Sequence, residues 1–206
     1  NDQMYVYLTT VKNNSDYKGM SCLPGALIHV DETAESAAER VLIERTNLRP
    51  QEVYLEQLAS FSSVKRDKRS RSVAIAYLGL VGSANIPPEG DIEKGAFVPL
   101  KKIKNLAFDH KEIVTAAYER LRNKIHYSTI IKKLLKGKFT FRDFQKIHEV
   151  VLDKELDKRN FRKKIMALGL ISETGSYKKD GRMRPAMLFT WNSSKVESYD
   201  ILGFAK

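Results

Sequence analysis

The chain has 206 residues, 42% hydrophobic and 30% charged, which is typical of a soluble globular protein with one large or two small domains. No apolar run approaches the roughly 18 residues of a membrane span, so an integral membrane protein is excluded. The single cysteine, Cys22, excludes an intramolecular disulfide and fits a buried side chain in the reducing cytoplasm. The cysteine and four histidines lack metal-ligand spacing, and no signal peptide is visible.

The net charge of +11 is concentrated in the last two-fifths of the chain. Residues 124–206 contain 19 Lys and Arg against 9 Asp and Glu, whereas residues 1–123 contain 17 basic and 16 acidic residues. This asymmetry predicts two domains, 1–123 and 124–206, and favours a polyanion as the partner of the second. The alternative is a basic surface that only keeps the protein in solution.

The first domain is expected to begin with a strand over residues 4–11, where side chains alternate. After a polar loop the chain passes through Leu23-Pro24-Gly25. Thr33 and the acidic residues beside it then predict a helix start, and Asn47, which tolerates a left-handed backbone, predicts the end of that helix.

Beyond this helix the sequence predicts a strand over residues 53–61 and a continuous apolar strand over 73–81, buried on both faces. A basic loop, residues 65–71, joins the two strands. A short strand over residues 95–99 follows, and Asp109 is the expected cap of a helix that runs to about Leu121.

The stretch from Leu23 to Leu48 resembles the Nudix box of metal-dependent phosphoanhydride hydrolases. In that box a glycine is followed six residues later by a glutamate, and then by Arg-Glu-apolar-x-Glu-Glu-x-Gly. Aligned without gaps, Ala26 replaces the glycine, Glu32 is the first glutamate and Arg40 is the arginine. The positions that follow are Val41, Leu42, Ile43, Glu44, Arg45, Thr46 and Asn47. The same stretch is also an ordinary amphipathic helix, which does not explain its Leu-Pro-Gly start.

Only Glu44 survives of the three clustered carboxylates of the box, and this loss bears directly on the chemistry. Mg²⁺ prefers several oxygen ligands in octahedral array, and hydrolysis needs the ion to polarise the phosphoryl oxygen and activate water. Val41 offers no lone pair, and Arg45 places a positive charge where the metal would sit. We therefore expect no metal, no cofactor and no hydrolysis by the usual mechanism of the family.

Three arginines of the basic loop suit a pyrophosphate, because guanidinium groups match phosphate oxygens in pairs: Arg66, Arg69 and Arg71. Alternatively, they form a solvated turn, or ion pairs with Glu44 and Glu56. His110 is a further candidate for ligand contact, with helix capping or packing as its alternative.

The second domain is expected to contain three short helices and two strands. The helices are predicted over residues 128–135, 140–151 and 157–168, with Asp157 as the cap of the third. An apolar stripe in the second comprises Phe141, Phe144, Ile147 and Val151, and one in the third comprises Phe161, Ile165 and Leu168. Strands over 170–174 and 186–191 enclose a basic turn, so the pattern predicts a winged helix-turn-helix.

The third helix would enter the major groove of DNA, and the wing would contact phosphates or the minor groove. The residues expected to bind DNA are Lys158, Arg159, Asn160, Arg162 and Lys163 on the helix, with Lys179, Arg182 and Arg184 in the wing. A basic helix alone is usually a solvated face; three ordered helices, a wing and the charge asymmetry together favour DNA binding.

The whole chain resembles the NrtR family, Nudix-related transcriptional regulators of NAD metabolism. The segments on which this resemblance rests are Leu23-Pro24-Gly25, Arg66-Asp67 with Arg69 and Arg71, Ala76-Tyr77, Leu106 to His110, Leu156 to Lys164, and Arg184-Pro185-Ala186. Lys68 and Ser70 depart from the family pattern, where Pro and Gly are expected. Relatives in this family also regulate sugar operons.

The resemblance implies an α+β fold: an N-terminal Nudix-like α/β/α sandwich with a mixed sheet, and a C-terminal winged helix-turn-helix domain. A Nudix domain usually has one more strand before residues 4–11, which would lie upstream of Asn1 or be missing. The resemblance further implies a homodimeric repressor of NAD-metabolism genes, which binds a palindromic operator in double-stranded DNA and is released by ADP-ribose or a related nucleotide. The alternatives are a Nudix hydrolase acting on ADP-ribose or another nucleoside diphosphate derivative, and a non-specific nucleic-acid binder without an effector.

Overall fold

The computed structural model describes residues 3–12, 16–82, 92–179 and 185–199. The chain divides into two compact units, residues 3–120 and residues 121–206. The helices in the described ranges are all too short or too polar to cross a bilayer.

In the described residues of the first unit, the strands form two sheets. One has the order β2-β1-β5, from Ser21–Cys22, Tyr5–Thr10 and Ala96–Pro99, and the other pairs β3 (Tyr54–Phe61) with β4 (Ala74–Leu80). An α+β fold is confirmed. The described strand pairs are all antiparallel, however, and not part of one mixed sheet, because β3 and β4 form a hairpin and β1 takes both its partners in the antiparallel sense.

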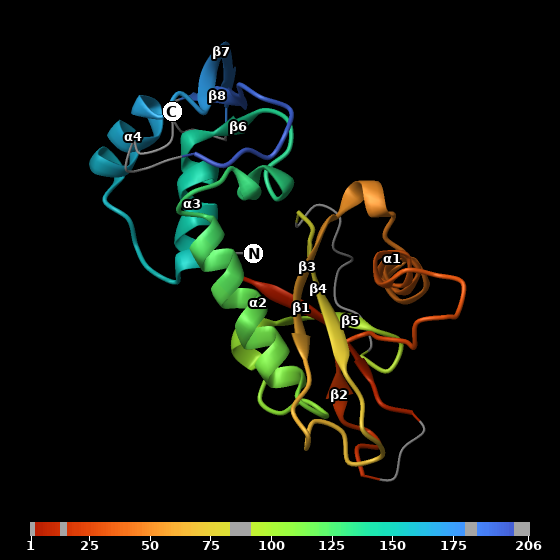
Figure 1. Cartoon of the computed structure of the whole chain (residues 1–206). Helices are drawn as coiled ribbons and strands as arrows, with labels where there is room; N and C mark the ends of the chain where they lie inside the picture. Colours follow the sequence, from red (N-terminus) through yellow and green to blue (C-terminus); the bar gives the residue numbers. More distant parts are fainter. Residues whose placement is uncertain (1–2, 13–15, 83–91, 180–184, 200–206) are drawn as a thin grey trace. The chain divides into compact units, whose positions relative to one another are not determined.

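Helices lie on both sides of these strands (Figure 1). The helix α1 (Ala34–Thr46) is on one side, and α2 (His110–Lys124) starts on the other. The Tyr7 hydroxyl donates a hydrogen bond to the Arg45 carbonyl and so ties β1 to α1. The Arg120 guanidinium donates to the Leu58 carbonyl at 2.9 Å and so ties α2 to β3. The described part of the unit also contains the short 3₁₀ turns η1 (Pro50–Glu52) and η3 (Leu100–Lys102).

The ends of α1 follow from local chemistry. The Thr33 hydroxyl accepts a hydrogen bond from the Ser36 N–H, and Asn47 ends the helix with a left-handed φ of 57°. Both boundaries were predicted. In contrast, β4 is not buried on both faces: Leu78 and Leu80 are buried on one face, while Ile75 on the other face is 39% exposed.

The core between the two layers of helices is small and aliphatic. It includes Leu8, Leu58, Leu78, Leu80 and Ile113, all buried. Cys22 is also buried, as expected, and its burial raises the pKa of the thiol. The sulfur is therefore poorly accessible and mostly protonated at neutral pH.

The second unit is a winged helix. It runs through η4 (Ile130–Lys133), β6 (Phe139–Thr140), α3 (Phe141–Leu152), α4 (Lys158–Ala167), β7 (Ile171–Lys178) and β8 (Ala186–Trp191), and its sheet has the order β6-β8-β7. The cap of α3 is reciprocal, since Thr140 and Asp143 each accept a hydrogen bond from the backbone N–H of the other.

The first of the three expected helices is reduced to the 3₁₀ turn η4. The Thr129 N–H donates to the Glu197 carbonyl and the Tyr199 N–H donates to the Tyr127 carbonyl, at 2.8 and 2.7 Å. Ser128 forms an isolated antiparallel bridge with Ser198, and these hydrogen bonds to the segment after β8 replace the start of the expected helix.

An aromatic cluster fills the centre of this unit. Phe144 and Phe189 are 1% exposed, and Trp191 lies 5.5 Å from Phe144 between ring centroids. The predicted stripe of α3 is wrong at one position: His148 is buried there, while Ile147 is half-buried. In α4, Ile165 is buried as expected, but Leu168 is 36% exposed because the helix ends before it.

Candidate functional site

The start of the box helix is held by Arg40. Its guanidinium donates to both carboxylate oxygens of Glu32, at 2.5 and 3.0 Å, and to the Leu27 carbonyl at 3.1 Å. The His29 N–H donates to the same carboxylate. The Arg40 guanidinium, then this N–H, hold the pKa of Glu32 at about 2. The frame of the box, loop and helix, is thus intact.

The metal-binding positions of the box do not fit a divalent cation. Glu44 is half exposed and lies 3.7 Å from Arg40, which neutralises it. Val41 and Arg45 occupy the other two carboxylate positions. In the ranges that the structure describes, no group of three or more His, Cys, Asp or Glu side chains is arranged to hold a metal ion. One neutralised carboxylate cannot replace the several oxygen ligands that Mg²⁺ requires.

Arg66 forms a buried ion pair with Asp109 at the start of α2. Its Nε and Nη2 donate to the two carboxylate oxygens at 2.8 and 2.9 Å, and its Nη1 donates to the Ser72 hydroxyl at 2.9 Å. The side chains are only 9% and 5% exposed. The partner is therefore neither Glu44 nor Glu56, the two carboxylates expected as alternatives for the arginines of this loop.

Arg69 is held in a similar way, but it keeps an open side. It donates to both carboxylate oxygens of Asp67, at distances from 2.7 to 3.2 Å, and this lowers the pKa of Asp67. Its guanidinium also lies 4.8 Å above the ring of Phe108, and Tyr17 packs against that ring with centroids 4.4 Å apart. The Arg69 side chain is still 49% exposed.

Arg71, the third arginine of the loop, makes its hydrogen bonds to the backbone and not to a carboxylate. It is exposed, and its Nη1 donates to the carbonyl of Ser62 at 2.9 Å. Its contacts are to neutral backbone carbonyls, and the side chain is exposed, so its charge is available to an anion.

His110 fastens the start of α2 to the start of the box. Its Nδ1 accepts a hydrogen bond from the Leu23 N–H at 2.9 Å, which places the ring proton on Nε2. Beside it, the Ala107 N–H donates to the Ser21 carbonyl. Burial lowers the pKa of His110 to about 4, so the ring is neutral at neutral pH.

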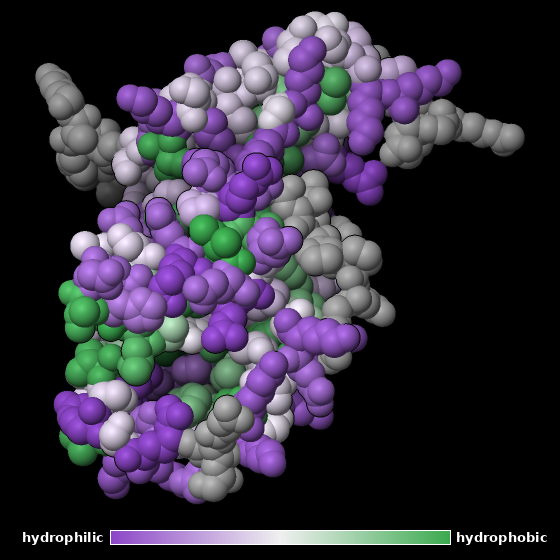
Figure 2. All heavy atoms as spheres, turned by 90° about the vertical axis from the view of Figure 1, so that its right-hand side faces the viewer, coloured by the Kyte–Doolittle hydropathy of each residue, from purple (hydrophilic) through white to green (hydrophobic). Residues whose placement is uncertain are grey.

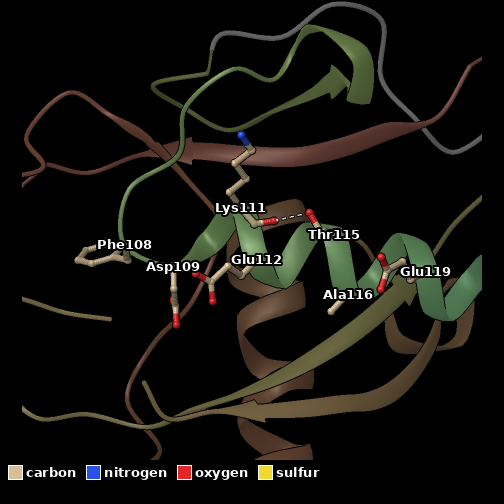
Figure 3. A pocket seen from close by; sticks show the side chains of 7 residues that line it. All are labelled: Phe108, Asp109, Lys111, Glu112, Thr115, Ala116 and Glu119. Carbon is tan, nitrogen blue, oxygen red and sulfur yellow. Dashed lines mark hydrogen bonds between the residues drawn. The ribbon is translucent and has the colours of Figure 1, made fainter. Parts of the chain in front are cut away.

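A hollow of about 420 Å³ opens along the exposed side of α2 (Figure 3). Its lining consists of Phe108, Asp109, Lys111, Glu112, Thr115, Ala116 and Glu119. In Figure 3 the carboxylates of Asp109 and Glu112 lie side by side, while Lys111 extends to the other side of the helix. Asp109 is neutralised by Arg66, so the charged groups of the lining are Lys111, Glu112 and Glu119, and the predicted ligand residues are not part of it.

The structure thus gathers three of the five predicted ligand residues, Arg66, Arg69 and His110, around Phe108 and Asp109. Arg71 lies against the backbone at Ser62 and Ser72, and Glu44 lies on α1 with Arg40. Asp109, Asp67 and Phe108 were not predicted as members of this cluster. Asp109 lies 43 residues from Arg66, and no spacing in the sequence links the two. Phe108 has a φ of 58°, which a sequence does not reveal for a phenylalanine.

The basic face of the second unit is formed by α4. Asp157 caps the helix, as predicted, by accepting from the Asn160 N–H at 2.8 Å. The five helix residues expected to bind DNA are all exposed: Lys158, Arg159, Asn160, Arg162 and Lys163. Lys179, which follows β7, is exposed as well, whereas Arg182 and Arg184 lie outside the described residues.

Arg162 differs from its neighbours on α4 because it has partners within the unit. Its guanidinium lies 4.9 Å from the ring centre of Phe141 and 5.3 Å from that of Phe189, and 3.6 Å from the carboxylate of Glu173 on β7. The side chain remains 44% exposed. Arg162 therefore joins α4 to the wing, while Arg159 is exposed on the same helix.

Comparison with known proteins covers both units. The profile of the NUDIX domain matches residues 1–117, and that of the NrtR DNA-binding winged helix domain matches residues 131–191. An ADPR responsive transcriptional repressor of Acinetobacter baylyi is 31% identical over 194 residues, which are 92% of this chain and 75% of that protein. An ADP-ribose pyrophosphatase of Methanocaldococcus jannaschii is 32% identical over 112 residues, 54% of this chain and 64% of that protein.

Among solved structures, NrtR of Shewanella oneidensis in complex with a 27mer DNA is similar along almost the whole chain. The TM-score is 0.77 at 30% sequence identity, and the match covers 93% of this chain and 88% of that one. The two profile matches, the long repressor relative and this structure agree on the same pair of domains in the same order. The chain belongs to the NrtR family of Nudix-related transcriptional regulators.

Proposed function

We propose that this protein is a transcriptional repressor of NAD-metabolism genes, in which a Nudix domain that no longer hydrolyses its ligand senses ADP-ribose or a related nucleotide. The observation that carries the proposal is a box with an intact frame and without its metal ligands. Arg40 still fastens Glu32 and the loop, while Val41 and Arg45 leave no site for Mg²⁺. Such a pocket can bind a nucleotide diphosphate without cleaving it.

The repressor half of the proposal rests on α4 and the charge of residues 124–206. Their 19 basic residues favour a polyanion, and the exposed residues of α4 suit the base edges of a major groove. We propose that the chain acts as a homodimer on a palindromic operator, with half-sites roughly 34 Å apart. Light scattering on the purified protein, alone and with a duplex, would measure the number of copies.

The effector half rests on the arginines of the basic loop. Arg71 and the half-exposed Arg69 offer guanidinium groups to a pyrophosphate, while Arg66 and His110 hold the surrounding backbone. Glu44 lies apart, on α1, and would contact a more distant part of the effector. The names of the two protein relatives support ADP-ribose as the first compound to test.

The test is binding of an operator duplex, measured by fluorescence anisotropy with and without ADP-ribose. We expect saturating ADP-ribose to lower operator affinity at least tenfold, because a ligand shifts the equilibrium only if it binds the two arrangements differently. Unchanged affinity would refute the switch. A duplex of scrambled sequence is the control, and equal affinity for both duplexes would favour a non-specific nucleic-acid binder.

A matched pair of variants tests the DNA-binding face. Arg159→Gln and Lys164→Gln each remove one positive charge from an exposed position of α4. We expect Arg159→Gln to weaken operator binding by about 10- to 100-fold, as loss of a base contact does, and Lys164→Gln to have a much smaller effect. Equal effects would mean that α4 contributes charge alone.

The alternative function is hydrolysis of ADP-ribose, favoured by the likeness to the pyrophosphatase. Incubation with ADP-ribose and Mg²⁺, followed by chromatography of the products, decides it. We expect no turnover above buffer. Turnover that disappears in Glu44→Gln would establish an enzyme.

A further inference from the structure

We infer that the buried ion pair between Arg66 and Asp109 transmits effector binding to the DNA-binding unit, so that these two residues position α2 and do not contact the effector. The inference rests on the proposed function. Asp109 directly precedes α2, which begins at His110 in the first unit and ends at Lys124 in the second. A displacement at Asp109 therefore acts on a helix that both units share.

The chemistry of the pair makes it a firm link. Three N–H groups of Arg66 are bonded, two to Asp109 and one to Ser72, and both charged groups are almost fully buried. Separating such a pair leaves an uncompensated charge in the interior, which costs several kcal/mol. The basic loop and the first turn of α2 are therefore expected to move together.

Asp109 is joined to the helix through its backbone as well. Its carbonyl accepts hydrogen bonds from the N–H groups of Glu112 and Ile113, at 2.9 and 3.3 Å. One residue thus binds the loop with its side chain and the helix with its main chain. Asp109 also lines the hollow along α2, so a change there alters the surface of that helix.

Phe108 supplies the flexible point of the link. Its left-handed backbone, at φ 58°, is unfavourable for a phenylalanine and is maintained by packing of the ring between Tyr17 and Arg69. A pyrophosphate that attracts Arg69 would compete with this packing and with Asp67. When Arg69 leaves the Phe108 ring to bind the pyrophosphate, the backbone at Phe108 would relax. The start of α2 would then shift.

The test compares the double variant Arg66→Gln/Asp109→Asn with wild type. The double variant removes both charges together, which avoids a lone buried charge. A second double variant, Arg49→Gln/Glu52→Gln, removes an ion pair at the surface and serves as the control. For each protein, titration calorimetry measures affinity for ADP-ribose, and anisotropy measures operator affinity without and with saturating ADP-ribose.

We expect Arg66→Gln/Asp109→Asn to bind ADP-ribose and operator separately within about threefold of wild type, while the ratio of the two operator affinities falls at least tenfold, towards one. The control should keep the wild-type ratio. An unchanged ratio in the first variant would overturn the inference, and so would loss of ADP-ribose binding, because Arg66 would then be a contact residue.

Phe108→Gly keeps all charges and tests the same link if the double variant does not fold. Glycine accepts the left-handed backbone, and the ring contacts are lost. We expect a lower ratio, with operator affinity kept and ADP-ribose affinity at or above that of wild type, because Arg69 no longer packs on the ring; an unchanged ratio would again overturn the inference. A wild-type ratio of one would instead refute the proposed function, so the two failures are distinguishable.

Discussion

His148 is expected to make the winged helix unit less stable as the pH falls. The imidazole is buried between Phe144 and Phe161, with ring centroids 4.7 and 4.9 Å away, and its Nδ1 donates to the Phe144 carbonyl. Burial, opposed by this hydrogen bond, lowers the pKa of His148 from 6.5 to about 4. At a pH between about 4 and 6.5, the imidazole therefore carries a proton in the unfolded chain but not in the folded unit.

The sign and size follow from proton linkage. Because the unfolded state binds more protons in this range, stability falls as the pH is lowered through 6.5, and the full loss is reached below about pH 4. A change from 6.5 to about 4 corresponds to about 3 kcal/mol in total, of which about 2 kcal/mol is lost between pH 7 and pH 5.

Urea denaturation, monitored by tryptophan fluorescence, measures this loss of stability in the winged helix unit. Trp191 is the single tryptophan of the chain and lies in the same aromatic cluster as His148. We expect wild type to lose about 2 kcal/mol from pH 7 to pH 5, and His148→Leu to lose little. His29→Gln, at an exposed position in the other unit, is the control and should behave as wild type. Equal losses in wild type and His148→Leu would refute the reasoning.

Two further changes test the first unit. Gly95→Ala is expected to destabilise the fold by about 2–4 kcal/mol, because φ is +99° and the new methyl group would overlap the Tyr7 hydroxyl. Gly19→Ala, at φ +79° in open space, should cost only about 1 kcal/mol. Thermal denaturation should show the larger loss for Gly95→Ala, and equal losses would contradict the packing argument. Arg40→Ala should free the loop of residues 27–32 and speed its cleavage in limited proteolysis, and an unchanged cleavage rate would show that other contacts hold it.

Local chemistry determined which features could be predicted from the sequence. The caps at Thr33, Asn47 and Asp157 depend on residues within one helical turn, and all three are present in the structure. The order α3, α4, β7 and β8 in the winged helix unit was predictable for the same reason. The replacement of two Nudix-box carboxylates by Val41 and Arg45 could also be read from the sequence, because it depends on residue identity alone.

Features that depend on distant partners could not be predicted. The short η4 turn results from hydrogen bonds between Thr129 and Glu197, 68 residues apart, and the partner of Arg66 lies 43 residues away. The burial of His148 in place of Ile147 is decided by the ring of Phe161 on the next helix. Periodicity identifies a face of a helix, but the neighbouring element decides which of two adjacent side chains is covered.

The burial of Cys22 has a practical consequence for following the proposed switch. With its thiol shielded and its pKa raised, the chain has no readily alkylated sulfur, and Cys22 is its single cysteine. A cysteine introduced at Lys164, on the exposed surface of α4, would consequently accept a spin label or a fluorophore selectively without any native residue being removed. In a homodimer, the separation between two such labels would report directly on how far apart the two recognition helices stand, with and without nucleotide.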